Sequence, residues 1–226
     1  MVNLLFDYDG TLHDSLAIYA PAVLAAYDDL VSRGLALGAP PDRETIQRWI
    51  GMTPSEMWEQ FQPQLSSQEK QAGGAYIGRR MQELVEEGKA RLYPGVPQVL
   101  DALKKLGVGM LLLSNCPVSY LRAHTACFGL ERWFDGLYCG EQFQYLPKYE
   151  ILPILKKRWP GEFLVIGDRN QDMEMARKNQ VSAVGCTYGY GSPEELSGAD
   201  WLAGTPEEVP YFVREFLGTN QVLEHI

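Results

Sequence analysis

The sequence of 226 residues predicts an α/β protein that has a doubly wound parallel sheet and an inserted, purely helical domain. Three observations lead to this prediction. Short apolar runs that end in polar residues alternate with segments of helical periodicity. The run VGMLLL at residues 108–113 is apolar throughout, which is typical of a parallel strand covered on both faces. After the first run, residues 15–88 show helical patterns and no convincing strand.

The first predicted strand ends in two acidic residues. The apolar run LLF at residues 4–6 is short and bounded by turn residues, which favours a buried strand over a helix. Asp7 follows the run directly, Asp9 comes two residues later, and Gly10 permits a sharp exit from the sheet edge. A lone DxD pattern is weak evidence for a site. The string DYDGTL after an apolar run is far more specific.

The segment 15–88 is expected to consist of helices. The strings TPSE and SSQE are capping boxes that mark helix starts at Thr53 and Ser66, because hydroxyl and carboxylate groups there bond the free backbone N–H groups. The adjacent Gly73 and Gly74 weaken the middle of the last helix. The expected helices cover residues 15–34 and 43–50, begin at residue 53, and cover residues 66–88.

The alternation of strands and helices resumes after residue 89 and continues to the C-terminal helix. Each apolar run is followed by polar or glycine residues and then by a helical segment. With right-handed crossovers, this alternation gives a parallel sheet covered on both faces. The expected strands cover residues 108–113, 135–139, 163–166 and 181–186, and the expected helices 94–106, 117–128, 150–158, 172–179 and 206–217.

The composition is that of an ordinary globular protein with an acidic balance. Hydrophobic residues make up 46% of the chain and charged residues 22%. The chain has 20 Lys and Arg against 29 Asp and Glu, a formal net charge of −9. This balance disfavours nucleic acid as a partner, because phosphate backbones bind basic surfaces. An anionic substrate must therefore be attracted by a local metal ion or lysine, not by the overall field.

Cysteine spacing and the N-terminus predict a cytoplasmic protein without a membrane partner. The cysteines form no CxxC pair and no zinc pattern, so free thiols in a reducing compartment are expected. The N-terminus enters a strand without the basic and apolar regions of a signal peptide. No apolar run approaches the about 20 residues of a membrane helix. The cysteines are Cys116, Cys127, Cys139 and Cys186.

Polar residues recur where the predicted strands end. Ligands of doubly wound sheets bind at the carboxyl ends of the strands, so these side chains are expected to converge. Asp7, Asp168 and Asp172 would form a negatively charged pocket of oxygen atoms, which suits a hard cation such as Mg²⁺. Without a cation the carboxylates would repel one another. The residues expected in this crevice are Asp7, Asp9, Ser114, Asn115, Lys148, Asp168 and Asp172.

These residues follow the order of a known set of motifs. Residues 7–12 (DYDGTL), Ser114, Lys148 and residues 167–172 (GDRNQD) resemble the four motifs of the haloacid dehalogenase-like hydrolase superfamily. The resemblance is to the branch that includes phosphoglycolate phosphatases and β-phosphoglucomutases, and it covers essentially the whole chain. It implies a Rossmann-like core with a helical-bundle cap inserted after the first motif. The implied domains are a core of residues 1–14 and 89–226 and a cap of residues 15–88.

The resemblance implies chemical roles for the acidic residues. Asp7 corresponds to a nucleophile that attacks a phosphorus atom held in line by a metal and positive donors. Asp9 corresponds to the general acid and base, and its backbone carbonyl to a metal ligand. Asp168 would bind Mg²⁺ directly, and Asp172 directly or through a water molecule. Because dehalogenase relatives lack the second aspartate, Asp9 favours phosphoryl chemistry.

Further polar residues would hold the phosphate. Ser114, where the family more often has threonine, would bond the phosphoryl oxygens together with N–H groups at the start of the next helix. Asn115 would be a second donor. Lys148 would neutralise charge on the nucleophile and the phosphoryl group. Tyr149 follows this lysine where the family commonly has proline.

Further positions near the motifs are expected to shape the site or to contact the substrate. Gly10 and Thr11 would shape the turn beneath the phosphate and offer it backbone N–H groups. His13 would either contact the substrate or fill a packing or surface role. Arg48 would bind a second anionic group of the substrate from a loop between cap helices, with a salt-bridged surface arginine as the alternative. This loop is expected to contain Arg48, Trp49, Gly51, Met52 and Thr53.

The predicted function is Mg²⁺-dependent hydrolysis of a small phosphomonoester through a phospho-aspartate. One alternative is a sugar phosphomutase of the β-phosphoglucomutase type, which shares the core motifs. Another is a phosphate-accepting regulatory domain, against which the large insertion argues, because a cap separates substrate from bulk water. The expected partner is a small phosphorylated metabolite, and both a monomer and a homodimer remain open.

Overall fold

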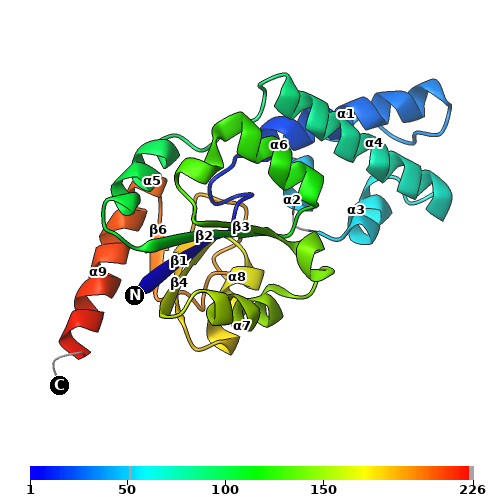
Figure 1. Ribbon diagram of the computed structural model, residues 1–226. Coiled ribbons are helices and arrows are strands. Elements are labelled where there is room, and N and C mark those ends of the chain that lie inside the picture. Colours follow the sequence, from blue (N-terminus) through cyan, green and yellow to red (C-terminus); the bar gives the residue numbers. More distant parts are fainter. Residues whose placement is uncertain (51, 224–226) are drawn as a thin grey trace. The chain divides into compact units, whose positions relative to one another are not determined.

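The computed structural model describes residues 1–50 and 52–223. Its first compact unit comprises Met1–Asp14 and Leu92–Ile226. This unit contains a six-stranded sheet in the order β3-β2-β1-β4-β5-β6 (Figure 1), and every pair of neighbouring strands is parallel. The strands are β1 (Val2–Phe6), β2 (Gly109–Ser114), β3 (Gly136–Cys139), β4 (Glu162–Gly167), β5 (Ser182–Cys186) and β6 (Trp201–Ala203).

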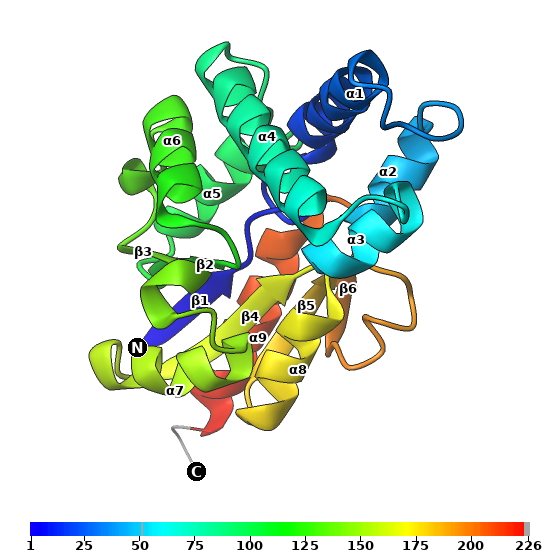
Figure 2. The same ribbon diagram turned by 90° about the vertical axis from the view of Figure 1, so that its right-hand side faces the viewer.

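Helices cover both faces of this sheet, which confirms the doubly wound fold (Figures 1 and 2). Successive side chains of a strand point to opposite faces. Phe6 of β1 accordingly packs in the cluster that contains α5, α6 and α9, and Leu5 in the cluster that contains α7 and α8. The helices are α5 (Val96–Lys104), α6 (Val118–Phe128), α7 (Lys148–Arg158), α8 (Asn170–Lys178) and α9 (Val209–Leu223).

The strand order places a topological switch point at the centre of the sheet. From β1 the chain builds β2 and β3 on one side and then β4, β5 and β6 on the other. Phe6, the last residue of β1, pairs with Leu112 of β2 and with Ile166 of β4. Ligands of open α/β sheets bind beyond the carboxyl ends of the strands at such a point. A ligand site is therefore expected at the residues that follow β1 and β4.

The second compact unit, Ser15–Arg91, is helical. Both predicted capping boxes are present, at Thr53 and Ser66. An aromatic cluster lies inside the unit, where the Phe61 ring lies 5.2 Å from the rings of both Trp49 and Trp58. The helices of the unit are α1 (Leu16–Ser32), α2 (Arg43–Trp49), α3 (Pro54–Phe61) and α4 (Ser67–Glu86).

The structure differs from the sequence prediction at several places. Strand β6 was not predicted, because its three residues are too few to show a periodicity. Lys148 is the first residue of α7 and does not precede the helix. Arg48 and Trp49 belong to α2 and not to a loop, while Gly51 lies outside the described residues. In the part of the chain that the structure describes, no helix has both the length and the apolar composition to cross a bilayer.

The glycines of α4 give a prediction about stability. A Cβ atom at Gly73 would lie 2.5 Å from Cη2 of Trp58, whose side chain is buried. Gly73→Ala is therefore expected to lower the free energy of unfolding by about 1–2 kcal/mol, because overpacking outweighs the better helix propensity of alanine. Gly78 lies on the same helix with open space around its Cβ position, so Gly78→Ala should stabilise the protein instead. Urea unfolding of both variants measures the difference, and equal stabilisation by both would contradict the packing argument.

Candidate active site

Three buried carboxylates meet at the switch point of the sheet. Asp7 follows β1 directly, and its N–H donates to the Ile166 carbonyl at 2.8 Å, so the strand ladder fixes its position. Asp168 is the residue after β4, and Asp172 lies in the first turn of α8. One oxygen from each carboxylate lies within 4.8 Å of the other two. The predicted convergence of these three acids is therefore present in the structure.

Lys148 connects two of these carboxylates. Its Nζ donates to Oδ1 of Asp7 at 2.6 Å and to Oδ1 of Asp172 at 2.7 Å, and only 3% of the side chain is exposed. Burial disfavours the charge on this lysine, but Asp172 and Asp7 outweigh that effect and raise the pKa of Lys148. The ammonium group therefore stays charged against the carboxylate of Asp7.

The charges of the cluster fit a divalent cation. Three carboxylates and one ammonium leave two negative charges without compensation when all groups are ionised. Burial, together with the charges of Asp172 and Asp168, raises the pKa of Asp7 well above its ordinary value despite Lys148. Burial and the charge of Asp172 likewise raise the pKa of Asp168 to about 6. The three carboxylates offer oxygen atoms as ligands, so Asp7, Asp168 and Asp172 suit a hard cation such as Mg²⁺.

Backbone and hydroxyl donors hold the Asp168 carboxylate in place. Thr11 donates from its Oγ1 to Oδ1 at 3.2 Å, and the Tyr190 N–H donates to Oδ2 at 2.8 Å. Gly10 has a φ of +92°, and a Cβ at this position would lie 2.2 Å from Oδ2 of Asp168. Only glycine fits both the backbone angle and the close approach. The sequence did not single out Tyr190, because a backbone donor from a distant loop leaves no residue-type signal.

Asp9 lies two residues from Asp7 and has hydrogen-bond partners of its own. His13 Nδ1 and the Tyr120 hydroxyl each lie 2.8 Å from its Oδ1. Burial disfavours ionisation of Asp9, but the hydrogen bonds and charges around it, His13 foremost, lower its pKa. His13 is fully buried, so it packs inside the protein and also contacts Asp9, a partner that the sequence did not reveal. Tyr120 was not predicted either.

The other predicted phosphate ligands lie at the same end of the sheet. Ser114 is buried at the end of β2, the strand beside β1. Asn115 follows it and donates from Nδ2 to Oε1 of Gln171 at 3.1 Å. The N–H groups of Gly10 and Thr11 donate to backbone carbonyls within their turn, at 2.9 and 3.3 Å, so these residues shape the turn. Phosphate contacts from all four residues stay predictions.

Arg48 has partners on its own helix. Its guanidinium lies 3.6 Å from the Glu44 carboxylate and donates to the Thr45 hydroxyl at 3.0 Å, while 63% of the side chain is exposed. This is the arrangement of a salt-bridged surface arginine. A role for Arg48 in substrate binding stays a prediction.

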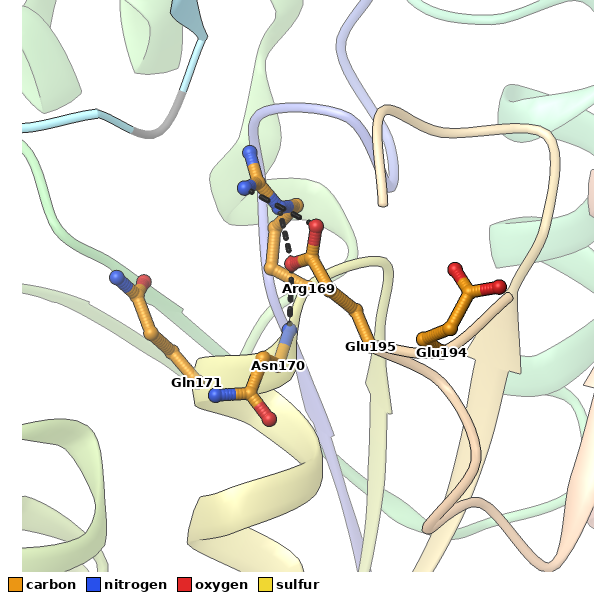
Figure 3. Close-up of a pocket in the computed structure, with 5 residues that line it drawn as sticks. All are labelled: Arg169, Asn170, Gln171, Glu194 and Glu195. Atoms are coloured by element: carbon orange, nitrogen blue, oxygen red, sulfur yellow. Dashed lines mark hydrogen bonds and ion pairs between the residues drawn. The ribbon is translucent and has the colours of Figure 1, made fainter. Parts of the chain in front are cut away.

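A shallow pocket lies at the start of α8, directly after Asp168 (Figure 3). The Arg169 side chain points at Glu195 and bonds it through Nε at 2.9 Å and through Nη2 at 3.4 Å. The Asn170 N–H also donates to this carboxylate, at 3.2 Å. The cation of this pocket, Arg169, is therefore bound to one of its two carboxylates, that of Glu195. The lining residues are Arg169, Asn170, Gln171, Glu194 and Glu195.

Known proteins are similar to this chain over almost its whole length. A phosphoglycolate phosphatase from Synechococcus elongatus is 28% identical over 96% of this chain and 99% of its own length. One from Haemophilus influenzae is 27% identical over 87% of this chain and 91% of its own. A crystal structure of a predicted phosphoglycolate phosphatase from Haemophilus somnus matches with a TM-score of 0.80 and 25% identity, covering 93% of this chain and 96% of that one.

The fold is shared more widely. CbbY from Rhodobacter sphaeroides, solved in complex with phosphate, matches with a TM-score of 0.72 at 19% identity, over 92% of this chain and 95% of that chain. The family model of haloacid dehalogenase-like hydrolases matches residues 2–179, which include β1, Lys148 and all three carboxylates of the cluster. The chain therefore belongs to the haloacid dehalogenase-like hydrolase family.

Proposed function

We propose that the protein is a Mg²⁺-dependent phosphatase that hydrolyses a small phosphomonoester, of the phosphoglycolate type, through a phospho-aspartate on Asp7. The observation that carries this proposal is the buried cluster of Asp7, Asp168, Asp172 and Lys148 at the switch point of the sheet. Such a cluster provides carboxylate ligands for a metal, and one of its members, Asp7, can act as the nucleophile. The names of the relatives support phosphoglycolate as the type of substrate.

The first step is transfer of the phosphoryl group to Asp7. A carboxylate oxygen of Asp7 forms a bond to phosphorus while the bond from phosphorus to the leaving alkoxide breaks. A Mg²⁺ held by Asp7, Asp168 and Asp172 would neutralise charge on the phosphoryl oxygens. Lys148 supplies further positive charge at Asp7, to which it already donates at 2.6 Å. Ser114 and Asn115 would donate hydrogen bonds to the same oxygens.

Asp9 moves the proton in both steps. As an acid it gives a proton to the departing alkoxide, and as a base it takes a proton from the water that attacks the phospho-aspartate. In this second step the water oxygen bonds to phosphorus while the bond from phosphorus to Asp7 breaks, so inorganic phosphate leaves and the Asp7 carboxylate is restored. Its side chain is 29% exposed, whereas those of Asp7 and Asp172 are 9% and 1% exposed. The greater exposure suits a group that must reach both a leaving group and a water molecule.

The test is phosphate release from a panel of phosphomonoesters. The panel includes phosphoglycolate, sugar phosphates and nucleotides, each with Mg²⁺, with a chelator, and with a sugar bisphosphate primer. Mg²⁺-dependent release of phosphate without a primer is the expected result. Primer-dependent conversion of one sugar phosphate into another, without phosphate release, would overturn the proposal in favour of a mutase.

The raised pKa of Asp168 gives a second test that needs no turnover. We expect Mg²⁺ to raise the melting temperature by several degrees at about pH 7.5 and by clearly less at about pH 5, because protons compete for the metal ligands. The folded-state pKa of Asp168, about 6, lies above the ordinary aspartate value of 3.8, so the metal-free protein loses stability as the pH rises between these two values. Mg²⁺ should restore that loss. Asp168→Asn serves as the control and should show little shift at either pH. A wild-type shift that is as large at the lower pH would contradict the assignment.

A further inference from the structure

We infer that His13 and Tyr120 are positioning residues that hold the carboxylate of Asp9 for proton transfer. The inference rests on the proposed function, in which Asp9 is the general acid and base. Both partners bond the same oxygen, Oδ1, each at 2.8 Å. No hydrogen bond among the described residues reaches Oδ2, and 29% of the side chain is exposed. Oδ2 is therefore the atom available to a leaving group or to water.

The turn that carries the first motif fixes His13. The His13 N–H donates to the Tyr8 carbonyl at 2.9 Å, and the His13 carbonyl accepts from the Gly10 N–H at 2.9 Å. The imidazole ring stacks on the Tyr8 ring at 5.3 Å and meets the His124 ring edge-on at 4.5 Å. Its side chain is fully buried. The ring thus has one orientation, with Nδ1 toward Asp9.

Tyr120 approaches the same oxygen from α6. Its hydroxyl donates to Oδ1 of Asp9 and lies 3.4 Å from His13 Nδ1. Its ring lies 4.1 Å from the ring of His124. A tyrosine hydroxyl keeps its proton at neutral pH, so it is a donor to the carboxylate. Helix α6 follows the strand that ends at Ser114, so one segment would place both a phosphate ligand and this donor.

Packing alone does not explain why the buried rings near Asp9 are polar. The Nε2 atoms of His13 and His124 are buried and have no hydrogen-bond partner among the residues that the structure describes. Burying a polar atom without a partner disfavours folding, and an apolar side chain of similar size would avoid that cost. For His13, the bond from Nδ1 to Asp9 is the compensating interaction that an apolar residue lacks. A fixed carboxylate also transfers protons faster than one that must find its orientation in each cycle.

The first part of the test compares the turnover of phosphoglycolate by variants of Tyr120 and His13 with that of the wild type. The variants are Tyr120→Phe, which removes only the hydroxyl, His13→Leu, which removes the donor, and His13→Asn, whose Nδ2 replaces Nδ1. We expect Tyr120→Phe and His13→Leu to lower kcat for phosphoglycolate by about tenfold or more, with KM changed by less than about twofold. His13→Asn should recover most of the loss. Tyr211→Phe is the control, because it removes another tyrosine–carboxylate bond, of 2.7 Å, on α9.

Para-nitrophenyl phosphate separates positioning from general damage. Its leaving group departs without a proton, so the initial burst of nitrophenolate should keep its wild-type rate in Tyr120→Phe. The later hydrolysis of the phospho-aspartate should slow, because it needs Asp9 as a base. A burst that slows as much as turnover of phosphoglycolate would overturn the inference, as would unchanged kcat in both variants. A wild-type protein that releases no phosphate with Mg²⁺ would instead overturn the proposed function, before any variant is compared.

Discussion

Asp7→Asn is expected to lower phosphate release by about 10⁴-fold or more, because an amide cannot replace the carboxylate as nucleophile. Loss of folding should not contribute to this effect. Burial raises the pKa of Asp7, so the folded protein already disfavours its negative charge. The neutral and isosteric asparagine should therefore leave the metal-free protein at least as stable as the wild type.

Two measurements on Asp7→Asn separate catalysis from stability. Turnover of the best phosphomonoester gives the first, and thermal unfolding without metal gives the second. Asp28→Asn makes the same chemical change at an exposed position of α1 and should match the wild type in both. If Asp7→Asn unfolded at a lower temperature than the wild type, its loss of activity could be caused by a less stable fold. An active and stable Asp7→Asn would show that another group attacks phosphorus.

Lys148→Met should reduce both turnover and stability. We expect turnover to fall by about 10²–10³-fold, since positive charge at the nucleophile and the phosphoryl group is lost. Without metal, the free energy of unfolding should fall by about 3 kcal/mol at neutral pH, because two buried carboxylates lose their shared partner. The loss of stability should shrink as the pH falls, because the raised pKa of Asp7 lets this carboxylate take up a proton early.

The control for Lys148→Met is Lys178→Met on α8. Lys178 pairs with Glu174 at 2.9 Å on the surface, where an ion pair contributes little. Phosphate release and urea unfolding with and without Mg²⁺ provide the data. If Lys148→Met kept wild-type turnover and stability, the lysine would have no role in the cluster.

The fold and the acidic cluster could be predicted from the sequence because they depend on local patterns. Apolar runs showed where β1 and β4 end, and in a doubly wound sheet those ends meet at one edge. Asp7 and Asp168 could thus be placed together although 160 positions separate them in the chain. The capping boxes at Thr53 and Ser66 were equally local, since each lies within four consecutive residues.

The contacts around Asp9 and Asp168 could not be predicted from local patterns. Whether Tyr120 reaches Asp9 depends on the rotation of α6 about its axis, and the amphipathic pattern of a helix fixes that only coarsely. The donor from Tyr190 is a backbone N–H, which every residue except proline has. Packing explains Gly73, which sequence alone showed only as a weak point of α4. Such features depend on which side chains meet across the fold.

The most direct test of the account is to capture the phosphoryl group on Asp7. Wild-type protein would be mixed with substrate and Mg²⁺, quenched within one turnover, and treated with borohydride, which reduces an acyl phosphate to an alcohol. Mass spectrometry of the peptides should then show homoserine in place of Asp7. The product should be absent without Mg²⁺ and in Asp7→Asn. Homoserine at another aspartate, or steady turnover with none at position 7, would contradict the assignment of Asp7 as the nucleophile.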